Sequence, residues 1–366
     1  MNVKRVGYFA GHRAGITSLA AGWGSKNNLL ISGSEDKTSR LWDMRTKKAV
    51  HGIVGFEQEI TAVEFVGDDS FAVACGNTIY VYDQRYIGIV HQAQKSNTNI
   101  FSNRSSGSSD IQSISTRGDF IAFVDEDGRL EVVDVTDAGL STSADGRFSK
   151  EIHDTVAACV CFHPELLLLA TGGFDSQVRI WDIASEKIIR QAAVGMVDSA
   201  QMSDSTPDAS SANRVRMVNP PFIYALAFAP GLASSDGEAA DVEHEAWTAV
   251  SGHADGRIMH TSAENSVYWP DCHNYSISAI RFMRSNPEIL ATAGLDKVIK
   301  LWNSDKIISP DNIGEGGESS GAVVKSTPPV LAHVDLIAKP DTLATAEYSP
   351  IIYTDENSSV VAFAVI

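Results

Sequence analysis

Three sets of side chains in this sequence have the residue types of a hydrolase triad. In the first set, His12 could activate the hydroxyl of Ser32 while Asp36 orients the imidazole, which is the chemistry of acyl transfer. The same types recur in two later segments, as His153, Thr171 and Asp175 and as His273, Thr292 and Asp296. A catalytic triad occurs once in an enzyme, so the repetition indicates a structural role. We therefore predict that the chain has no catalytic residues and is not an enzyme.

A tryptophan completes each of the three sets at a constant spacing. The hydroxyl residue precedes the aspartate by four positions, and the tryptophan follows the aspartate by six; these tryptophans are Trp42, Trp181 and Trp302. A catalytic triad would not need such a tryptophan. The match in register across three segments indicates an internal repeat.

Three further groups of residues have weaker claims to chemistry. Cys159, Cys161 and His163 alternate along one apolar segment as metal ligands can, but no second Cys or His pair completes a four-ligand site, which favours core cysteines. The glycine-rich stretch 314–321 has no lysine behind it, and its glutamates would repel phosphate. The segment Asp125–Gly128 lacks the spacing of a calcium loop. We predict no metal site and no cofactor.

The elements that must hold these residues are β strands joined by tight turns. Runs such as Val178–Asp182 and Val298–Trp302 alternate in polarity, as strands do. Segments with an aspartate between such runs, for example Ser34–Lys37, favour tight turns. Units of this kind that repeat about every 40–45 residues with a Trp-Asp ending resemble the WD-repeat propeller family. In that family the four residues form one hydrogen-bonded set, in which the aspartate accepts from the histidine and the tryptophan N–H reaches the hydroxyl.

The resemblance implies an all-β fold, in which residues 1–366 form a single seven-bladed β-propeller. The three segments with all four residue types are the first, fourth and sixth blades. Weaker copies supply the other blades, and the residues at their tryptophan positions are Tyr82, Val133, Thr261 and Phe363. In the fifth blade, Asn219 takes the place of the histidine.

Both ends of the sequence fit closure of a propeller ring. In the family, the N-terminal strand becomes the outer strand of the last blade, and closure of this kind removes a free sheet edge. Val3–Phe9 and the apolar run at 360–366 have the composition for this pairing. The excess length lies in polar inserts that we expect to be loops, at about 95–110, 136–150, 193–219, 231–244 and 304–327.

One motif points to a partner. The stretch Leu30–Arg45 resembles the sixteen-residue box of WD-repeat proteins that bind cullin-4 ubiquitin ligases, and it ends in Trp42-Asp43-Met44-Arg45. The second blade ends in a looser copy, with Asp83 and Arg85. The resemblance implies that Arg45 and Arg85, together with Asp43 and Asp83, contact the damaged-DNA-binding adaptor of the ligase. An arginine fork at the rim of one face can bond carbonyls or carboxylates of a partner. Trp-Asp-x-Arg is also common in propellers that never meet this ligase.

Composition narrows the other partners. Lys and Arg total 29 against 46 for Asp and Glu, so the net charge is −17, which argues against a broad surface for nucleic acid or anionic lipid. The absence of an apolar run behind the first residues predicts a cytoplasmic or nuclear protein. We expect a protein-binding scaffold, monomeric within a larger complex, that serves as receptor or associated factor of a cullin-4 ligase. A general scaffold of a chromatin, trafficking or ribosome-assembly complex is the alternative.

Overall fold

The computed structural model describes residues 3–93, 98–102, 109–134, 148–193, 220–230, 247–308, 323–324, 327–346, 351–355 and 359–365. These residues fold almost entirely into β strands, so the all-β prediction is confirmed. The short helices in this part of the chain are the 3-10 helix η1 (Gly24–Lys26) and α1 (Asp305–Ile308). None of the helices in the described ranges is long and apolar enough to cross a membrane.

The strands of the described residues form seven sheets, and in each sheet the first strand named is the innermost. The first sheet contains β2 (Ile16–Ala21), β3 (Leu29–Ser34), β4 (Ser39–Asp43), β5 (Lys48–Val54) and β9 (Val90–Gln92). The second contains β6 (Ile60–Val66), β7 (Ser70–Cys75), β8 (Thr78–Asp83) and β10 (Thr98–Ser102). The third contains β11 (Ile111–Arg117), β12 (Phe120–Asp125), β13 (Arg129–Asp134) and β14 (Phe148–Glu151).

The other four sheets follow in chain order. The fourth contains β15 (Ala157–Phe162), β16 (Leu168–Gly173), β17 (Gln177–Asp182) and β18 (Lys187–Ala193). The fifth contains β19 (Ile223–Phe228), β20 (Thr248–His253), β21 (Ile258–Ser262), β22 (Ser266–Trp269) and β26 (Val323–Val324). The sixth contains β23 (Ile277–Met283), β24 (Asn286–Gly294), β25 (Val298–Asn303) and β27 (Val330–Asp335). The seventh contains β28 (Pro340–Ala344), β29 (Ile351–Asp355), β30 (Ser359–Val365) and β1 (Val3–Ala10).

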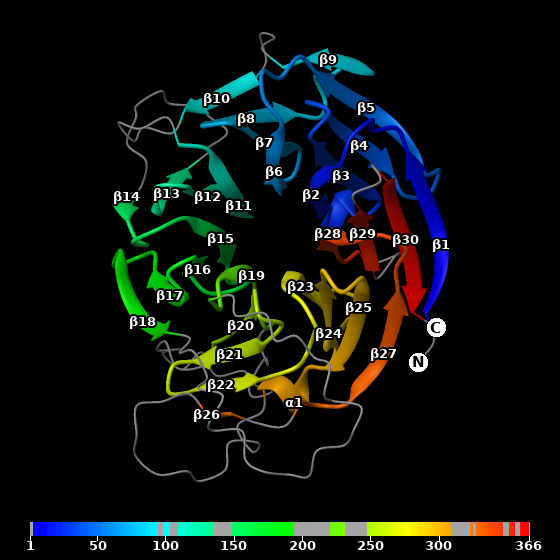
Figure 1. The fold of residues 1–366 in the computed structure, drawn as a ribbon. Coiled ribbons are helices and arrows are strands. Elements are labelled where there is room, and N and C mark those ends of the chain that lie inside the picture. Colours follow the sequence, from blue (N-terminus) through cyan, green and yellow to red (C-terminus); the bar gives the residue numbers. More distant parts are fainter. Residues whose placement is uncertain are drawn as a thin grey trace, which may run out of the picture.

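The sheets lie around a common centre, as Figure 1 shows. Each innermost strand contacts the innermost strands of both neighbours, in the order β2, β6, β11, β15, β19, β23, β28 and back to β2. In the seventh sheet, β1 pairs with β30 in antiparallel register from Val3 opposite Val365 to Ala10 opposite Ser359. Strands from the two ends of the chain therefore share one sheet.

Hydroxyl side chains join neighbouring innermost strands. The Ser18 Oγ on β2 accepts the backbone N–H of Val63 on β6 at 3.0 Å, and Ser115 Oγ on β11 accepts that of Phe162 on β15 at 3.0 Å. Thr345, just beyond β28, donates to the Phe282 carbonyl on β23 at 2.9 Å. Because the hydroxyls meet backbone groups, these contacts fix the angle and distance between adjacent sheets as well as satisfying polar atoms.

Apolar side chains fill the space between adjacent sheets. The first and second sheets share a buried cluster that includes Ile31, Phe65 and Tyr82. The seventh and first sheets share another, in which Phe9 of β1 packs edge-on against Trp42 with ring centroids 5.9 Å apart. Most strands in the interior of the sheets are thus buried on both faces, which explains why their sequences are nearly continuous apolar runs.

The predicted inserts contain more regular structure than expected. Strand β10 lies inside the insert at 95–110, and β14 begins inside the one at 136–150. Helix α1 and strand β26 lie inside the insert at 304–327. The sequences of these short elements have no distinct periodicity of apolar residues. The polar composition of the inserts therefore did not predict them. Residues 194–219 and 231–246, which hold most of the other two inserts, lie outside the described residues.

Two sheets gain a fifth strand in parallel pairing. β9 lies between β8 and β10 in the chain, yet it pairs with β5 of the first sheet. Likewise, β26 lies between β25 and β27, yet it pairs with β22 of the fifth sheet. In each case, the chain segment that leads to the outer strand of one sheet pairs with the outer edge of the preceding sheet. This pairing removes an unpaired strand edge.

Candidate functional site

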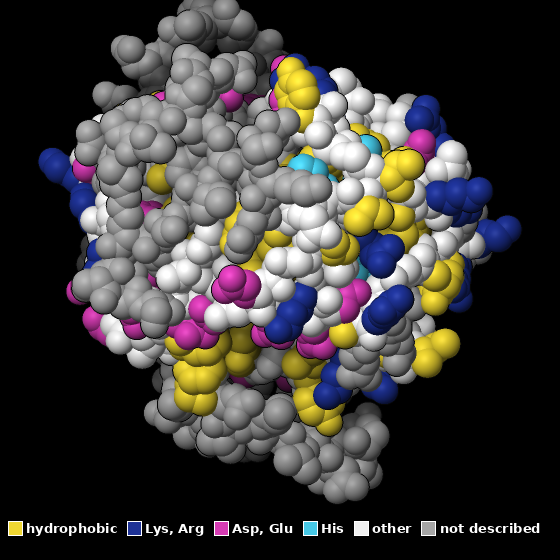
Figure 2. Space-filling model, turned by 90° about the horizontal axis from the view of Figure 1, so that it is seen from above, with side chains coloured by type: hydrophobic (Ala, Val, Ile, Leu, Met, Phe, Trp, Pro, Cys, Tyr) yellow, Lys and Arg dark blue, Asp and Glu magenta, His cyan; other side chains and the backbone are white. Residues whose placement is uncertain are grey.

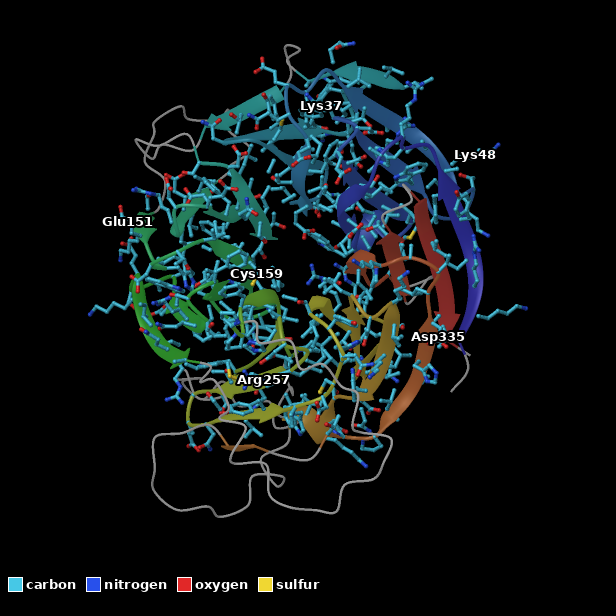
Figure 3. The ribbon with its side chains drawn as sticks, in the orientation of Figure 1. Lys37, Lys48, Glu151, Cys159, Arg257 and Asp335 are labelled. Atoms are coloured by element: carbon cyan, nitrogen blue, oxygen red, sulfur yellow. The ribbon has the colours of Figure 1, made fainter. Side chains whose placement is uncertain are left out.

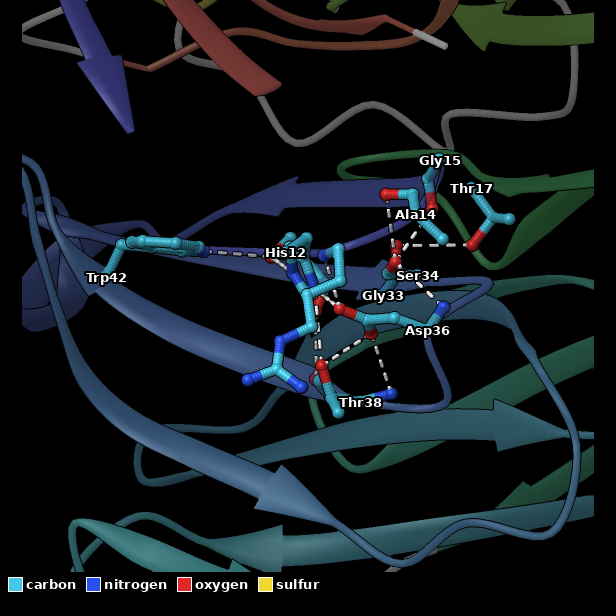
Figure 4. Close-up of polar contacts among 12 residues, drawn as sticks. His12, Ala14, Gly15, Thr17, Gly33, Ser34, Asp36, Thr38 and Trp42 are labelled. Carbon is cyan, nitrogen blue, oxygen red and sulfur yellow. Dashed lines mark hydrogen bonds and ion pairs between the residues drawn. The ribbon is translucent and has the colours of Figure 1, made fainter. Parts of the chain in front are cut away.

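The first triad-like set is a buried hydrogen-bond chain. Trp42 Nε1 donates to Ser32 Oγ at 2.8 Å, and Ser32 Oγ lies 2.7 Å from His12 Nε2. Figure 4 shows His12 between Trp42 and Asp36. The His12 Nδ1 lies 3.0 Å from a carboxylate oxygen of Asp36. Because the indole can only donate, the one hydroxyl hydrogen is left for His12 Nε2, and Nδ1–H then donates to Asp36. Every polar atom along the chain is satisfied in this arrangement.

The fourth and sixth sheets repeat the arrangement. Trp181 Nε1 donates to Thr171 Oγ1 at 3.2 Å, and Trp302 Nε1 donates to Thr292 Oγ1 at 2.8 Å. The corresponding histidine-to-aspartate distances are 2.9 Å for His153 Nδ1 to Asp175 and 3.0 Å for His273 Nδ1 to Asp296. The structure therefore brings together all four members of each predicted set.

Burial and charge make these sets unsuitable for catalysis. The hydroxyl residues Ser32, Thr171 and Thr292 have 0% exposure, so a substrate has no access to them. Burial opposes ionisation of Asp175, but hydrogen bonds from His153 and Arg179 outweigh it and lower its pKa to about 2. The carboxylate thus stays charged and holds its histidine. In each set, the aspartate lies in the turn between the second and third strands, and the histidine lies in the loop before the first strand. Their hydrogen bond holds the turn against the loop.

The fifth sheet satisfies its buried serine differently from the prediction. His253 at the end of β20 lies with Nε2 2.8 Å from Ser251 Oγ, and its Nδ1 lies 3.2 Å from the Pro221 carbonyl. The histidine thus comes from the strand of the serine itself, instead of from the loop before the sheet. Asn219, which was expected in that place, lies outside the described residues. Thr261 pairs with Ala249, as Trp42 pairs with Leu30 in the first sheet, so it holds the tryptophan position.

The other weak copies also keep their strand positions. Tyr82 takes the tryptophan position of the second sheet and donates its hydroxyl to the Ala93 carbonyl at 3.0 Å, and burial raises its pKa. Val133 pairs with Ile121 in the third sheet. Phe363 pairs with Arg5 and Ile351, and its side chain lies outside the described residues.

The turn after β4 clamps Arg45 onto Asp43. Arg45 donates from Nε to Asp43 Oδ1 at 3.2 Å and from Nη2 to Asp43 Oδ2 at 2.9 Å, and its backbone N–H also bonds Asp43 Oδ1 at 2.8 Å. Hydrogen bonds from Arg45 hold the pKa of Asp43 below its usual value, against a smaller effect of burial. The arginine side chain is nevertheless 69% exposed. The aspartate thus fixes the direction of an exposed guanidinium.

The turn after β8 holds Arg85 with two carboxylates. Its Nε lies 2.9 Å and its Nη2 2.5 Å from oxygens of Asp83, while Nη1 lies 2.9 Å from Asp69. Hydrogen bonding to Asp83 raises the pKa of Arg85. The sequence had suggested two forks that project toward a partner. The structure shows that each fork is bonded to its own aspartate while the arginine side chain stays more than half exposed, and that Arg85 bonds a second carboxylate.

Both arginine turns lie at the same end of the sheets. Innermost and third strands run in the same direction in an antiparallel sheet, so β2 and β4 finish at one end, as do β6 and β8. The 3-10 helix η1 follows β2 at that end. Its Lys26 donates from Nζ to the Gly67 and Ser70 carbonyls at 2.8 and 3.1 Å and so binds the first sheet to the second. Burial lowers the pKa of Lys26 to about 8.

Three of the four cysteines are buried, and Cys161 is partly exposed. Cys159 is buried on β15, its thiol donates to the Gly172 carbonyl at 3.7 Å, and burial raises its pKa. Figure 3 shows Cys159 toward the inside of the ring, whereas Lys48 and Glu151 lie at the periphery. In the ranges that the structure describes, there is no group of three or more His, Cys, Asp or Glu residues placed to hold a metal ion. The stretch 314–321 lies outside those ranges.

Sequence reasoning missed the charged residues of the central cavity. Glu64 of β6 and Arg281 of β23 line it, and Arg284 follows at the end of β23. The signal was present, because the first five residues of β6, Ile-Thr-Ala-Val-Glu, align with Ile-Ser-Ala-Ile-Arg of β23. The fifth position of both segments is a charged residue within an otherwise apolar pattern.

Comparison with protein families matches three segments. The family model described as "WD domain, G-beta repeat" matches residues 3–43, 140–182 and 264–303. These segments end with the tryptophans of the first, fourth and sixth sheets and contain most of their strands.

Comparison with known proteins gives distant relatives. The chain is 24% identical to WD repeat-containing protein 53 homolog of Dictyostelium discoideum over 80% of this chain and 76% of that protein. It is 26% identical to pre-mRNA-processing factor 19 of Caenorhabditis elegans, over 48% of this chain and 32% of that protein. It is 27% identical to spindle assembly checkpoint protein bub3 of Schizosaccharomyces pombe, over 52% of this chain and 58% of that protein. The last two likenesses span half of the chain and about a third to a little over a half of the relatives.

Proposed function

Because this chain contains WD40 repeats in three places, we propose that its sheets are the seven blades of one closed propeller over residues 1–366, and that it acts as a protein-interaction scaffold without enzymatic activity. WD-repeat proteins are generally such scaffolds. The cycle of contacts among innermost strands and the pairing of β1 with β30 support the closed ring. The burial of all three triad-like sets supports a role without catalysis.

The finer proposal is that the scaffold is a substrate receptor or associated factor of a cullin-4 ubiquitin ligase. It would act in the cytoplasm or nucleus, as one copy within the larger assembly. The observation that carries this proposal is the Asp43 clamp on an Arg45 side chain that remains 69% exposed. A clamped arginine loses little conformational entropy on binding, so it is suited to meet the ligase's damaged-DNA-binding adaptor.

The two arginines are not equivalent in this role. Arg85 already bonds Asp83 and Asp69 through all three of its nitrogens, so a partner would have to compete with two carboxylates. Arg45 bonds Asp43 with Nε and Nη2 and is more exposed. We infer that Arg45 is the principal contact and that Arg85 assists from the neighbouring sheet.

Co-purification of the full-length protein with the adaptor tests this proposal. We expect Arg45→Ala to reduce recovery of the adaptor at least tenfold and Arg85→Ala to reduce it less. Arg13→Ala is the matched control, because Arg13 is an exposed arginine that precedes β2 and so lies at the opposite end of the same sheet. Equal recovery of the adaptor with wild-type protein and with the Arg45→Ala variant would exclude this docking mode.

A scaffold in another assembly is a second candidate. The connection after Arg85 exposes apolar side chains, with Tyr86 64%, Ile89 80% and Val90 68% exposed. An apolar patch on this connection can serve a partner that does not read the arginine turns. Purification of the tagged protein that yields a chromatin, trafficking or ribosome-assembly complex, and lacks the adaptor and cullin-4, would favour this alternative.

A further inference from the structure

A cavity of about 420 Å³ lies where the innermost strands end. Its lining includes the fifth residue of all seven of these strands. In five strands the fifth residue is small, and these residues are Ala20, Ser115, Cys161, Ala227 and Ala344. Small side chains at these positions leave the centre open. The ring thus contains a space that seven strands build from equivalent positions.

The fifth positions of the other two innermost strands hold the large charged residues Glu64 and Arg281. Arg284, three residues after Arg281, also lines the cavity and is exposed. The remaining wall is largely apolar, with side chains such as Leu226 and Phe282. Two guanidinium groups and one carboxyl group therefore face a mostly apolar space.

The two arginines lack the carboxylate partners that other arginines of this protein have. Arg281 Nη1 donates to the Ile280 carbonyl at 2.9 Å, and Arg284 Nη1 donates to the Gly22 carbonyl at 2.9 Å. The guanidinium of Arg284 also lies 5.6 Å from the centre of the Trp23 ring. Among the described residues, no carboxylate oxygen lies within 4 Å of either guanidinium. Five other described arginines are bonded to a carboxylate, and these are Arg45, Arg85, Arg129, Arg179 and Arg257. Arg117 and Arg190 donate to backbone carbonyls.

Arg281 and Arg284 thus share one cavity and bond backbone carbonyls in a chain that is rich in carboxylates. With a net charge of −17, carboxylates are abundant. Figure 2 shows Lys and Arg side chains on one face as separate groups, with no continuous basic field. Arg281 is partly buried and Arg284 is exposed, and an arginine fork is best satisfied by a carboxylate or phosphate. Arg281 and Arg284 thus have donors left for an anion in the cavity.

We propose that this end of the cavity binds an acidic segment of a partner protein, with one Asp or Glu carboxylate held between Arg281 and Arg284. The apolar wall suits the neighbouring side chains of such a segment. Glu64 disfavours a polyphosphate, because several negative charges would lie close to its carboxylate in a cavity of low polarity. A single carboxylate meets two positive charges against one negative charge.

Glu64 sets the strength of this site. Burial raises the pKa of Glu64, and the charges of Arg284 and Arg281 only partly oppose that effect. The backbone N–H of Phe65 donates to the Glu64 carboxyl at 3.1 Å. In its ionised form, the Glu64 carboxylate lowers the positive potential of the two arginines and repels a bound carboxylate. Replacement of Glu64 by glutamine therefore strengthens binding of a carboxylate.

Selection from a random peptide library displayed on phage tests the proposal. The whole protein is the target, and the Arg281→Gln/Arg284→Gln protein is the counter-target. We expect peptides that prefer the wild-type protein to be enriched in Asp or Glu next to apolar residues. A selection that yields no such preference, or that yields preferred peptides without acidic residues, overturns the proposal.

Binding of one selected peptide, synthesised with a fluorescent label and an amidated C-terminus, then locates the site. We expect the Kd to rise at least tenfold with Arg281→Gln or with Arg284→Gln and to fall severalfold with Glu64→Gln. Arg190→Gln is the matched control, because Arg190 also donates to a backbone carbonyl, that of Glu264, but lies on the outer strand β18. Circular dichroism and thermal melting establish that each variant is folded.

Three results would contradict the proposal. The first is a Kd that is unchanged in the folded Arg281→Gln variant. The second is binding that requires a free peptide C-terminus, because the side-chain carboxylate would then not be the ligand. The third is stronger competition by inorganic tripolyphosphate than by the unlabelled peptide. Arg45 does not line the cavity, so Arg45→Ala should leave the Kd of the peptide unchanged whether or not it reduces recovery of the adaptor.

Discussion

Ser32 has two buried partners, and this explains why the sequence keeps four residue types together. It accepts from Trp42 and donates to His12, whose other nitrogen holds Asp36. A change at the hydroxyl therefore affects both neighbours. Strict spacing is the result, because each side chain reaches the next only from its own strand position. For this reason the spacing in the sequence was sufficient to identify the three sets.

We expect Ser32→Ala to lower the free energy of unfolding by about 2–6 kcal/mol, because two buried polar atoms lose their partner at about 1–3 kcal/mol each. Ser39→Ala is the matched control, since Ser39 is equally buried but makes one bond, to the Ser32 carbonyl at 3.0 Å. It should cost about 1 kcal/mol. Urea denaturation of the two variants measures both values. Equal losses would show that the hydroxyl does not join the set as described.

The residues that sequence reasoning did not identify make contacts that no fixed spacing along the chain marks. His253 meets Ser251 from two positions further along the same strand, and no fixed spacing to a preceding loop marks it. Arg281 and Glu64 face the cavity because they occupy the same position in two strands of one ring. Their meaning becomes visible only when innermost strands are aligned with each other. The pairing of Arg85 with Asp69 depends on which turns lie side by side.

At the scale of elements, the fifth sheet has an unusual set of buried histidines. His253 and His260 are both buried, and burial lowers the pKa of each to about 4. Among the residues that the structure describes, His260 Nε2 has no hydrogen-bond partner. Their ordinary pKa is about 6.5, so the unfolded chain takes up protons before the folded sheet does. Stability contributed by this sheet is therefore present above about pH 6.5 and is lost as the pH falls toward about 4.

We expect His260→Leu to reduce this acid sensitivity. Between pH 7 and pH 5, the wild-type protein should lose about 2 kcal/mol more free energy of unfolding than the variant, at about 1.4 kcal/mol per pKa unit. Denaturant titrations at the two pH values measure the difference. His333→Leu is the control, because His333 lies exposed on β27. If the wild-type protein and the His260→Leu variant show the same pH dependence, His260 is not the source.

Prediction of elements succeeded where periodicity was strong and failed where pairing depends on distant chain segments. Alternating runs such as Val178–Asp182 are part of the strands that were expected. The short strands β9 and β26 are fixed by the edge they meet, which local sequence does not encode. For the same reason, the sequence did not predict correctly where the polar inserts begin and end.

At the scale of the whole molecule, β1 joins the two ends of the chain. It pairs with β30, and its Phe9 is 2% exposed in a cluster with Trp42 of the first sheet. The next residue toward the N-terminus, Tyr8, is 48% exposed. Successive residues of a strand point to opposite faces. Phe9 therefore holds the seventh sheet to the first, whereas Tyr8 faces solvent.

We expect Phe9→Ala to lower the free energy of unfolding by about 3–5 kcal/mol, as for other buried phenylalanines. Tyr8→Ala should cost less than about 1 kcal/mol, because most of its area is already exposed. Thermal melting and urea denaturation of the two variants provide the comparison. A Phe9→Ala protein as stable as Tyr8→Ala would mean that β1 is not docked against the first sheet in solution.

The parallel strands β9 and β26 have a consequence for how the molecule comes apart. Main-chain hydrogen bonds cross between sheets there, as from the Gly52 N–H to the Ile89 carbonyl at 2.8 Å and from the Ala93 N–H to the Val54 carbonyl at 2.9 Å. The first and second sheets should therefore open together, and so should the fifth and sixth. Native-state hydrogen exchange would then show two pairs of sheets that each open as one unit, while the other sheets open singly. The cooperative unit of this ring is therefore not always the single repeat that the sequence displays.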